Sequence, residues 1–277
     1  MGILVEEYRG DAWGGMLCRM DEFGPSTYGD RIADVYDTLY GELPYGGPVE
    51  TTVAFLVELA AGRPALELGI GTGRVAVPLA AAGVEVHGID ASEAMVDRLR
   101  SKPGGDGIQV TIADFRTFTL PQRFGLVYAV FNTFFALLTQ DDQVACFRAI
   151  SRHLEPEGAF VMEAFVPDLA RFDRGQRVAA VRVESDEVAL EVTMHDPVAQ
   201  VSGSQQVVIR EDAVRLFPIR IRYAFPPELD LMARLAGMRL RGRWADWDRS
   251  AFGPGAQKHV SVWEVDPEPD VRGSSGA

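Results

Sequence analysis

Short apolar runs alternate with helical periods between residues 65 and 165. Five runs are typical of strands, and in the segments between them apolar side chains recur every three or four positions, as in helices. The runs are 65–68, 84–89, 108–112, 125–131 and 158–165, and the helical segments are 75–82, 92–101 and 141–154. This alternation predicts a doubly wound, mostly parallel sheet with helices on both faces.

After residue 167 the pattern changes to strands separated by short gaps. Such gaps favour antiparallel pairing. A further helix and two closing strands complete the chain and bring the main sheet to seven strands. The expected fold class is therefore α/β, a doubly wound, mostly parallel seven-stranded sheet with an added antiparallel β layer. The layer is expected at 177–185, 187–195, 199–209 and 213–223, the helix at 227–236, and the closing strands at 238–245 and 259–265.

The flanking segments complete the expected organisation. Two short helical patterns, 2–8 and 30–40, are typical of a cap rather than a domain, and a helix over 48–61 begins at Pro48 and ends before Gly62. The tail is rich in turn-forming residues and is expected to be disordered. The expected divisions are a helical cap (1–46), a core (47–168), an antiparallel insertion (169–225), a C-terminal helix with strands (226–266) and the tail (267–277).

The charge balance bears on the partners of the protein. Lysine and arginine total 27 against 40 for aspartate and glutamate, a formal net charge of −13. Because nucleic-acid binding depends on neutralising phosphates, we expect no nucleic-acid partner. The strongest basic strip is Arg239, Arg241 and Arg243, whose spacing would put all three side chains on one solvated strand face.

Cysteine usage and hydropathy indicate a compartment. Cys18 and Cys146 show neither metal-ligand spacing nor a pairing pattern, so they are interpreted as reduced thiols and no metal site is expected. The first residues carry two acids where a signal peptide needs a basic flank, and no stretch reaches ~18 uncharged apolar residues. These features favour a cytoplasmic protein without a membrane partner.

A glycine-rich turn between the first expected strand and the following helix is the strongest chemical signal. Its sequence is Glu67-Leu-Gly69-Ile-Gly71-Thr-Gly73. Glycines there let the backbone turn tightly and let a ligand approach closely. Asp90 ends the next strand, 21 residues after Gly69, where doubly wound folds place an acid for ribose hydroxyls. Asp114 follows the third strand at the same edge of the sheet.

Each acid also has an ordinary structural interpretation. Asp90 is compatible with a helix N-cap, although Ser92 suits that position better. Asp114 is compatible with a simple turn residue. Two acids at successive strand ends after a glycine turn nevertheless favour a shared ligand site.

Four ordered motifs resemble those of the class I S-adenosylmethionine-dependent methyltransferases, over roughly residues 48–168. They are Glu67-x-Gly69-x-Gly71-x-Gly73, Gly88-Ile-Asp90-x-Ser92, Ala113-Asp114-Phe115 and His153-Leu-x-Pro156-x-Gly158. Tyr36-Asp-x-x-Tyr40 and the antiparallel layer resemble, more narrowly, the branch that contains aminosugar N-methyltransferases and glycine N-methyltransferases. A Rossmann-like methyltransferase fold is what the resemblance implies.

The resemblance implies S-adenosylmethionine as cofactor. This molecule carries no phosphate, and the loop accordingly has no lysine. Asp90 would accept from the ribose, Asp114 from the exocyclic amine, and the Phe115 N–H would serve a ring nitrogen. Tyrosines near the N-terminus would lie over the sulfonium or form a packed helix stripe. The implied cofactor contacts are Tyr28, Tyr36, Glu67, Gly69, Gly71, Gly73, Asp90, Ala91, Asp114, Phe115, Val130 and Phe131.

The resemblance also implies the reaction, methyl transfer to an N or O atom of a small-molecule acceptor. The composition suggests a high-GC bacterial source and hence secondary metabolism. Asn132 and Phe135 are expected to contact the acceptor, although the aromatics at 131–135 are equally suited to starting a helix that buries the sheet. Candidate catalytic residues are Glu163, His195 and His259, against the alternative that strand-end histidines are structural.

Other interpretations remain open from the sequence. The antiparallel layer would roof the acceptor pocket, or would form a homodimer interface as in related enzymes. The same cofactor also supports cyclisation or elimination. A nicotinamide enzyme or a non-catalytic binding protein is disfavoured, because Gly69-x-Gly71-x-Gly73 departs from the dinucleotide pattern Gly-x-Gly-x-x-Gly.

Overall fold

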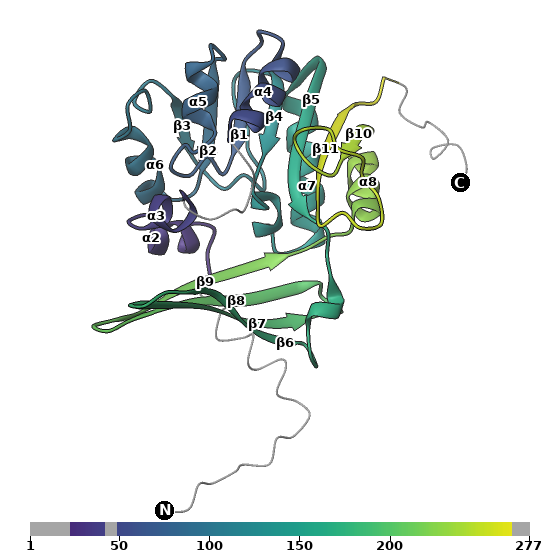
Figure 1. The fold of residues 1–277 in the computed structure, drawn as a ribbon. Coiled ribbons are helices and arrows are strands. Elements are labelled where there is room, and N and C mark those ends of the chain that lie inside the picture. Colours follow the sequence, from purple (N-terminus) through teal and green to yellow (C-terminus); the bar gives the residue numbers. More distant parts are fainter. Residues whose placement is uncertain (1–22, 42–48, 268–277) are drawn as a thin grey trace, which may run out of the picture.

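The expected seven-stranded, mostly parallel sheet is confirmed (Figure 1). The computed structural model describes residues 23–41 and 49–267. The strand order is β10-β11-β5-β4-β1-β2-β3, in which β11 runs antiparallel to both of its neighbours. The strands are β1 (Ala65–Leu68), β2 (Val86–Asp90), β3 (Gln109–Ile112), β4 (Phe124–Ala129), β5 (Leu154–Phe165), β10 (Met238–Trp244) and β11 (Lys258–Val265).

Helices cover both faces of this sheet. On one face α4 (Val49–Ala60) and α5 (Ala76–Ala81) share a buried apolar cluster with β4 and β5, which Leu99 of α6 (Glu93–Arg100) joins. On the other face α7 (Gln140–His153) and α8 (Pro226–Leu235) form a second cluster around Phe147 and Trp263. Helix α6 is capped by Ser92, whose Oγ accepts the Met95 N–H at 3.2 Å, so the cap is not Asp90.

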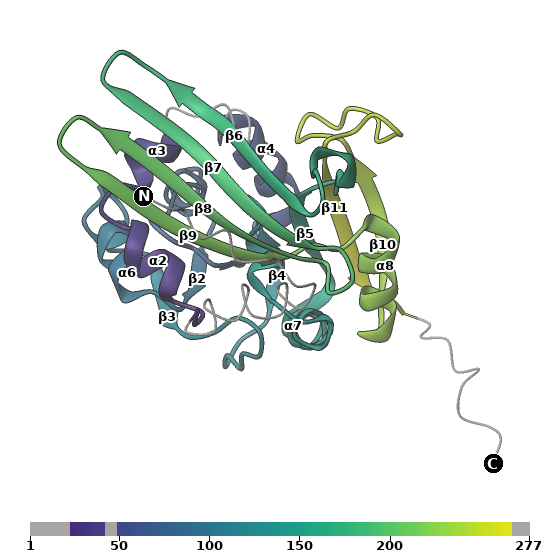
Figure 2. The same cartoon turned by 90° about the horizontal axis from the view of Figure 1, so that it is seen from below.

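A second, antiparallel sheet of four strands lies across the carboxyl edge of the main sheet (Figures 1 and 2). We call this sheet the roof. Its consecutive strands pair in order, as their short connections predict. They are β6 (Gln176–Val183), β7 (Glu187–Asp196), β8 (Val201–Arg210) and β9 (Val214–Arg222).

A buried arginine joins the roof to the core. The Arg222 guanidinium donates to Glu228 Oε1 in α8 at 2.7 Å and to Gln143 Oε1 in α7 at 2.6 Å. Because a buried charge is tolerated only when it is paired and hydrogen-bonded, this network fixes the end of β9 against two core helices. The position of the roof over the sheet edge is therefore well defined.

The N-terminal helices close the side of the molecule beside the roof. The pattern over 30–40 forms two short helices, α2 (Thr27–Ile32) and α3 (Tyr36–Gly41), instead of one. Their apolar residues Ile32 and Leu39 pack with Phe217 of the roof and Met95 of α6. The expected helix at 2–8 and nearly all of the expected tail lie outside the described residues.

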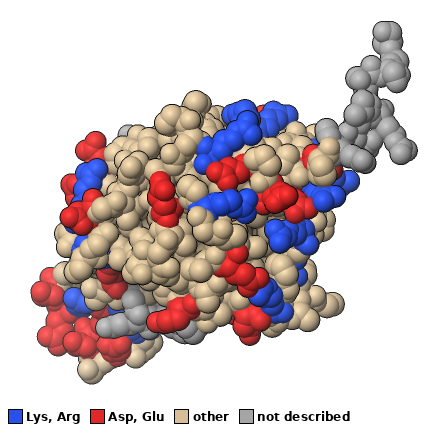
Figure 3. Space-filling view, turned by 90° about the horizontal axis from the view of Figure 1, so that it is seen from above, with Lys and Arg blue, Asp and Glu red and all other residues tan. Residues whose placement is uncertain are grey.

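The three arginines of β10 do not share one face, so that prediction is wrong. A bulge between Leu240 and Gly242 shifts the register, and Arg243 instead pairs with Asp230 of α8 at 2.7 Å. Arg239 lies 2.8 Å from Glu264. Basic side chains are interspersed with acidic ones on the face opposite the roof (Figure 3). Within the described ranges, no helix has the length and apolar character required to span a bilayer.

Candidate functional site

A cavity of about 1180 Å³ lies between the carboxyl edge of the main sheet, the N-terminal helices and the roof. Single-ligand pockets usually enclose about 300–1,000 Å³, so this volume is sufficient for a cofactor and a small acceptor together. The glycine turn after β1 and the ends of β2 and β3 line one part of it. The ends of β4 and β5 and the inner face of the roof line the other part.

The glycine turn has left-handed backbone at all three glycines, with φ of +67° at Gly69, +55° at Gly71 and +76° at Gly73. A Cβ on Gly71 would have no neighbour closer than 3.7 Å, whereas one on Gly69 would lie 2.4 Å from the Thr133 methyl. Gly71 is therefore the point where a ligand can approach the backbone. Gly73 lies outside the cavity lining, and its missing Cβ makes room for Leu99.

Asp90 joins the glycine turn to the end of β2. Its Oδ2 accepts the Gly71 N–H at 2.7 Å, and its Oδ1 accepts the Ser92 N–H at 2.8 Å. Burial raises the pKa of Asp90 above its ordinary value. Each carboxylate oxygen has a second lone pair, so the group can still accept from a ligand diol. Ala91 lines the cavity beside it.

The third strand contributes the neighbouring acid. Asp114 lines the cavity, where its Oδ1 accepts the Arg116 N–H at 2.8 Å and its Oδ2 lies 3.4 Å from the Arg116 guanidinium. Phe115 also lines the cavity, next to Asp114. The sequence predicted that both acids would lie at one edge, and the cavity brings them together.

Glu67 lies under the glycine turn and is only 3% exposed. Its Oε2 accepts a hydrogen bond from the Tyr128 hydroxyl at 3.0 Å. Burial, with a smaller contribution from the Asp90 charge, raises the pKa of Glu67 from 4.5 to about 8. The carboxyl therefore holds its proton at neutral pH, and a cationic ligand group nearby would favour its ionised form.

Glu67 gives a testable pH dependence of stability. Because its folded pKa is raised, its contribution is complete below about pH 4.5 and is lost as pH rises through about 8. We expect Glu67→Gln to abolish this loss. From pH 5 to pH 8 the unfolding free energy of the variant should therefore rise by about 1–3 kcal/mol relative to that of the wild type. Denaturant titrations of both proteins across this range measure the effect, and parallel curves would contradict it.

An aromatic cluster forms the wall of the cavity beside the glycine turn. The Tyr28 hydroxyl donates to the Tyr40 hydroxyl at 3.0 Å, and the rings of Tyr36 and Tyr40 lie 4.8 Å apart. Phe131 meets Tyr40 edge-on at 5.6 Å, and the Arg74 guanidinium lies 4.6 Å from the Phe131 ring centre. The tyrosines are thus both packed against one another and in contact with the cavity.

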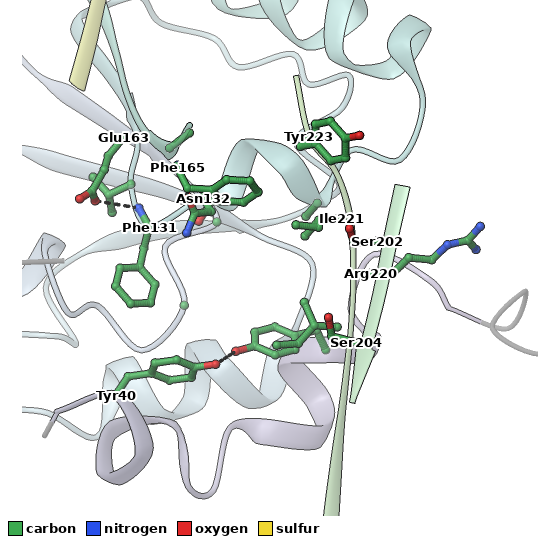
Figure 4. A pocket seen from close by; sticks show the side chains of 18 of the residues that line it. Tyr40, Phe131, Asn132, Glu163, Phe165, Ser202, Ser204, Arg220, Ile221 and Tyr223 are labelled. Atoms are coloured by element: carbon green, nitrogen blue, oxygen red, sulfur yellow. Dashed lines mark hydrogen bonds between the residues drawn. The ribbon is translucent and has the colours of Figure 1, made fainter. Parts of the chain in front are cut away.

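The turn after β4 is held by the end of β5. Phe131 and Asn132 both have positive φ, 60° and 65°, a conformation that costs about 1–3 kcal/mol for each non-glycine residue. Glu163 Oε2 accepts the Phe131 N–H at 3.1 Å (Figure 4). Asn132 Oδ1 accepts the Phe165 N–H at 2.8 Å. The Asn132 NH2 group can donate to a ligand, and the amide oxygen keeps a second lone pair.

Of the three candidate catalytic residues, Glu163 alone lines the cavity. Its second oxygen, Oε1, lies 3.2 Å from Lys258 Nζ. His195 stacks on Phe172 and its Nε2 lies 2.8 Å from the Tyr223 hydroxyl. Burial lowers its pKa.

His259 is fully buried and bonds Ser261 Oγ at 2.8 Å. Burial and the Arg243 charge lower its pKa to about 3. Phe135 is also fully buried, in the short 3-10 helix η1 (Thr133–Ala136), where its ring packs against Phe165. Neither residue lines the cavity. Val130 does, next to Phe131.

Several residues of the site were not predicted. Thr72 donates to Asp37 Oδ1 at 2.7 Å and thereby fastens α3 to the glycine turn. Lys258 of β11 neutralises Glu163 and lies 2.8 Å from Asp246. Alternating polar residues in β8 face the cavity from the roof. The alternation of polar and apolar residues is visible in the sequence. It does not indicate which face of the strand would face the cavity.

Comparisons with known proteins agree with this geometry. A family model described as a methyltransferase domain matches residues 65–158. The cypemycin N-terminal methyltransferase of a Streptomyces species is 31% identical over 221 residues, which cover 79% of this chain and 89% of that protein.

Solved structures are similar over most of the chain. The CcbJ methyltransferase of Streptomyces caelestis is 44% identical with a TM-score of 0.82, and the match covers 88% of this chain and all of that one. The amino pentose methyltransferase CalS10 of Micromonospora echinaspora, solved with S-adenosylmethionine bound, shares the fold with a TM-score of 0.62 at 22% identity, over 82% of this chain and 96% of its own.

Proposed function

Because this chain belongs to the class I S-adenosylmethionine-dependent methyltransferases, we propose that it methylates a nitrogen atom of a small-molecule amine. The residues around the glycine turn suit the cofactor of the family. Gly71 has no Cβ to exclude an adenosyl group, and Asp90 can accept from two ribose hydroxyls. The tyrosine wall offers ring faces to a sulfonium, an attraction worth about 0.5–2 kcal/mol.

S-adenosylmethionine supplies an electrophilic methyl group whose leaving group is a neutral thioether. The main task of the chain is then to hold the acceptor nitrogen in line with that methyl group. Correct placement of two reactants can contribute about 7–11 kcal/mol. The strained turn at Phe131 and Asn132, fixed by Glu163, gives the cavity a rigid wall at the point where the acceptor would lie.

One observation carries the choice of nitrogen. Of the three candidate catalytic residues, Glu163 is ion-paired with Lys258 and holds the Phe131 N–H in the cavity wall, and His195 and His259 lie outside the cavity lining. A hydroxyl acceptor benefits from a general base, whereas an amine needs only to be unprotonated. The name of the Streptomyces relative, an N-terminal methyltransferase, also supports an amine acceptor.

The proposal predicts how the rate depends on pH. With S-adenosylmethionine saturating, kcat/KM should rise about tenfold per pH unit and level off at the pKa of the free amine. The test compares two cyclic amines of similar size whose pKa values differ by about two units, such as cyclohexylamine and morpholine. The comparison shows whether the titrating group belongs to the substrate or to the enzyme. The inflection should move with the amine. Formation of S-adenosylhomocysteine measures the rate.

Cyclohexanol serves as the matched oxygen acceptor in the same assay. Faster methylation of cyclohexanol than of cyclohexylamine would overturn the proposal. An inflection at one fixed pH for both amines would do so as well, since it would assign the titrating group to the enzyme.

A further inference from the structure

The inner face of the roof is polar where it covers the cavity. Strand alternation directs Thr193 of β7 and Ser202, Ser204 and Gln206 of β8 to this face, and all four line the cavity. Further along the same face, Val208 and Phe217 pack on the N-terminal helices. The face therefore changes from apolar to polar at the point where it leaves the protein core and meets the cavity.

Two of these side chains have no hydrogen-bond partner among the described residues. Ser202 is 7% exposed and Gln206 is 9% exposed. The Gln206 amide oxygen is enclosed without a partner among the described residues, and the Ser202 hydroxyl lines the cavity on the same strand face. Thr193 and Ser204 differ, because their hydroxyls bond each other at 2.9 Å. Buried polar groups without partners are disfavoured. Because Ser202 and Gln206 also line the cavity, a ligand there can supply the partners that they lack.

The opposite wall of the cavity fixes how a ligand would lie. Figure 4 shows Phe131, Asn132 and Glu163 on one side and Ser202, Ser204 and Ile221 on the other, with the cavity between them. The cofactor contacts expected from the sequence adjoin Phe131. An acceptor whose reacting atom lies near Phe131 would therefore extend its far end to β8, with Ile219 and Ile221 of β9 beside it.

We propose that Ser202 and Gln206 bind hydroxyl or amide groups of the methyl acceptor, on the side away from its reacting nitrogen. The inference rests on the proposed amine methylation and adds the substrate class, an amine that carries hydrogen-bonding groups at its far end. The Ser202 hydroxyl can both donate and accept a hydrogen bond. The Gln206 carboxamide can present either its NH2 group or its oxygen when its terminal torsion rotates by a half-turn. The two side chains can therefore bind hydroxyl or amide groups. A purely aliphatic amine would leave both without a partner.

The test uses two amines that differ by one hydroxyl group, trans-4-aminocyclohexanol and cyclohexylamine. In the wild type we expect kcat/KM to favour the hydroxylated amine by about 3- to 10-fold, the usual range for one neutral hydrogen bond. Gln206→Leu and Ser202→Ala should each reduce this preference, and the affinity for S-adenosylmethionine should not change. The serine variant removes a single atom, so it keeps the test valid should the leucine variant fold poorly.

Gln205→Leu is the matched control. Gln205 is the adjacent residue in β8, and its amide oxygen also lacks a partner among the described residues, but it does not line the cavity. This variant should keep the wild-type preference. Equal loss of preference in Gln205→Leu would overturn the inference, and so would a wild type that does not distinguish the two amines.

A binding measurement separates this inference from the proposed function. Saturation-transfer NMR on the complex with S-adenosylhomocysteine compares the two amines without any methyl transfer. Tighter binding of the hydroxylated amine that depends on Ser202 and Gln206 supports the roof contact, whether or not either amine is methylated. Absence of methyl transfer to both amines would reject amine methylation. Transfer to both amines at equal rates, with equal binding, would reject the roof contact and leave amine methylation standing.

Discussion

A Gly71→Val variant is expected to fold and to bind S-adenosylmethionine more than about 100-fold less tightly than the wild type. The reason is local. A Cβ at residue 71 meets no protein atom closer than 3.7 Å, so the valine side chain extends into the cavity instead of into the core. Exclusion of the ligand then costs at least about 3 kcal/mol. The left-handed φ of +55° adds about 1–2 kcal/mol of backbone strain, which a protein of this size should tolerate.

Gly73→Val provides the contrast within the same turn. A Cβ at residue 73 lies 2.8 Å from a Leu99 methyl group and outside the cavity lining, so this variant should lose thermal stability first. Calorimetric titration with S-adenosylmethionine and thermal melts followed by circular dichroism distinguish the two effects. Gly71→Val binding within threefold of the wild type would mean that the turn does not approach the ligand.

Asp90→Ala is expected to weaken binding of S-adenosylmethionine by about 1–3 kcal/mol, or roughly 5- to 150-fold. The carboxylate would lose its hydrogen bonds with the ribose hydroxyls. It also accepts the Gly71 and Ser92 N–H groups at 2.7 and 2.8 Å, so its removal releases the glycine turn from β2. The two losses act on the same ligand and should reinforce each other.

Asp90→Asn separates the two contributions. Asparagine retains the shape and one acceptor oxygen but loses the charge, so its affinity should fall between those of the wild type and the alanine variant. Dissociation constants from calorimetry, with melting temperatures of the ligand-free proteins, complete the comparison. An Asp90→Ala dissociation constant equal to that of the wild type would remove Asp90 from the ligand site.

The local sequence pattern predicted much of the fold, but it did not predict where β4 ends. The apolar run predicts a strand through residue 131, yet the strand ends at Ala129 and the next residues turn into left-handed backbone. Phe131 and Asn132 have no sequence feature that demands positive φ. Their conformation depends on Glu163 and Phe165 of β5, which lie more than thirty residues later. Contacts between distant segments overrode the local preference.

The candidate catalytic residues show the same limit. Glu163 and His195 lie near the ends of their strands and His259 near the start of its own, and the sequence favours Glu163 only modestly over the two histidines. The structure places Glu163 in the cavity wall, His195 behind Tyr223 and His259 among fully buried side chains. Position along a strand says which end of the sheet a residue occupies. It does not say what packs over that end.

The sequence by itself determined the parallel core and the positions of the glycine turn, Asp90 and Asp114. These features follow from short-range rules, because parallel strands bring their carboxyl ends to one edge and glycines mark the turn that a ligand approaches. Only the tertiary structure decided which face of the roof covers the cavity, and hence that Ser202 and Gln206 face the ligand site while Gln205 does not. Alternation in a strand defines two faces, and the packing of distant segments chooses between them.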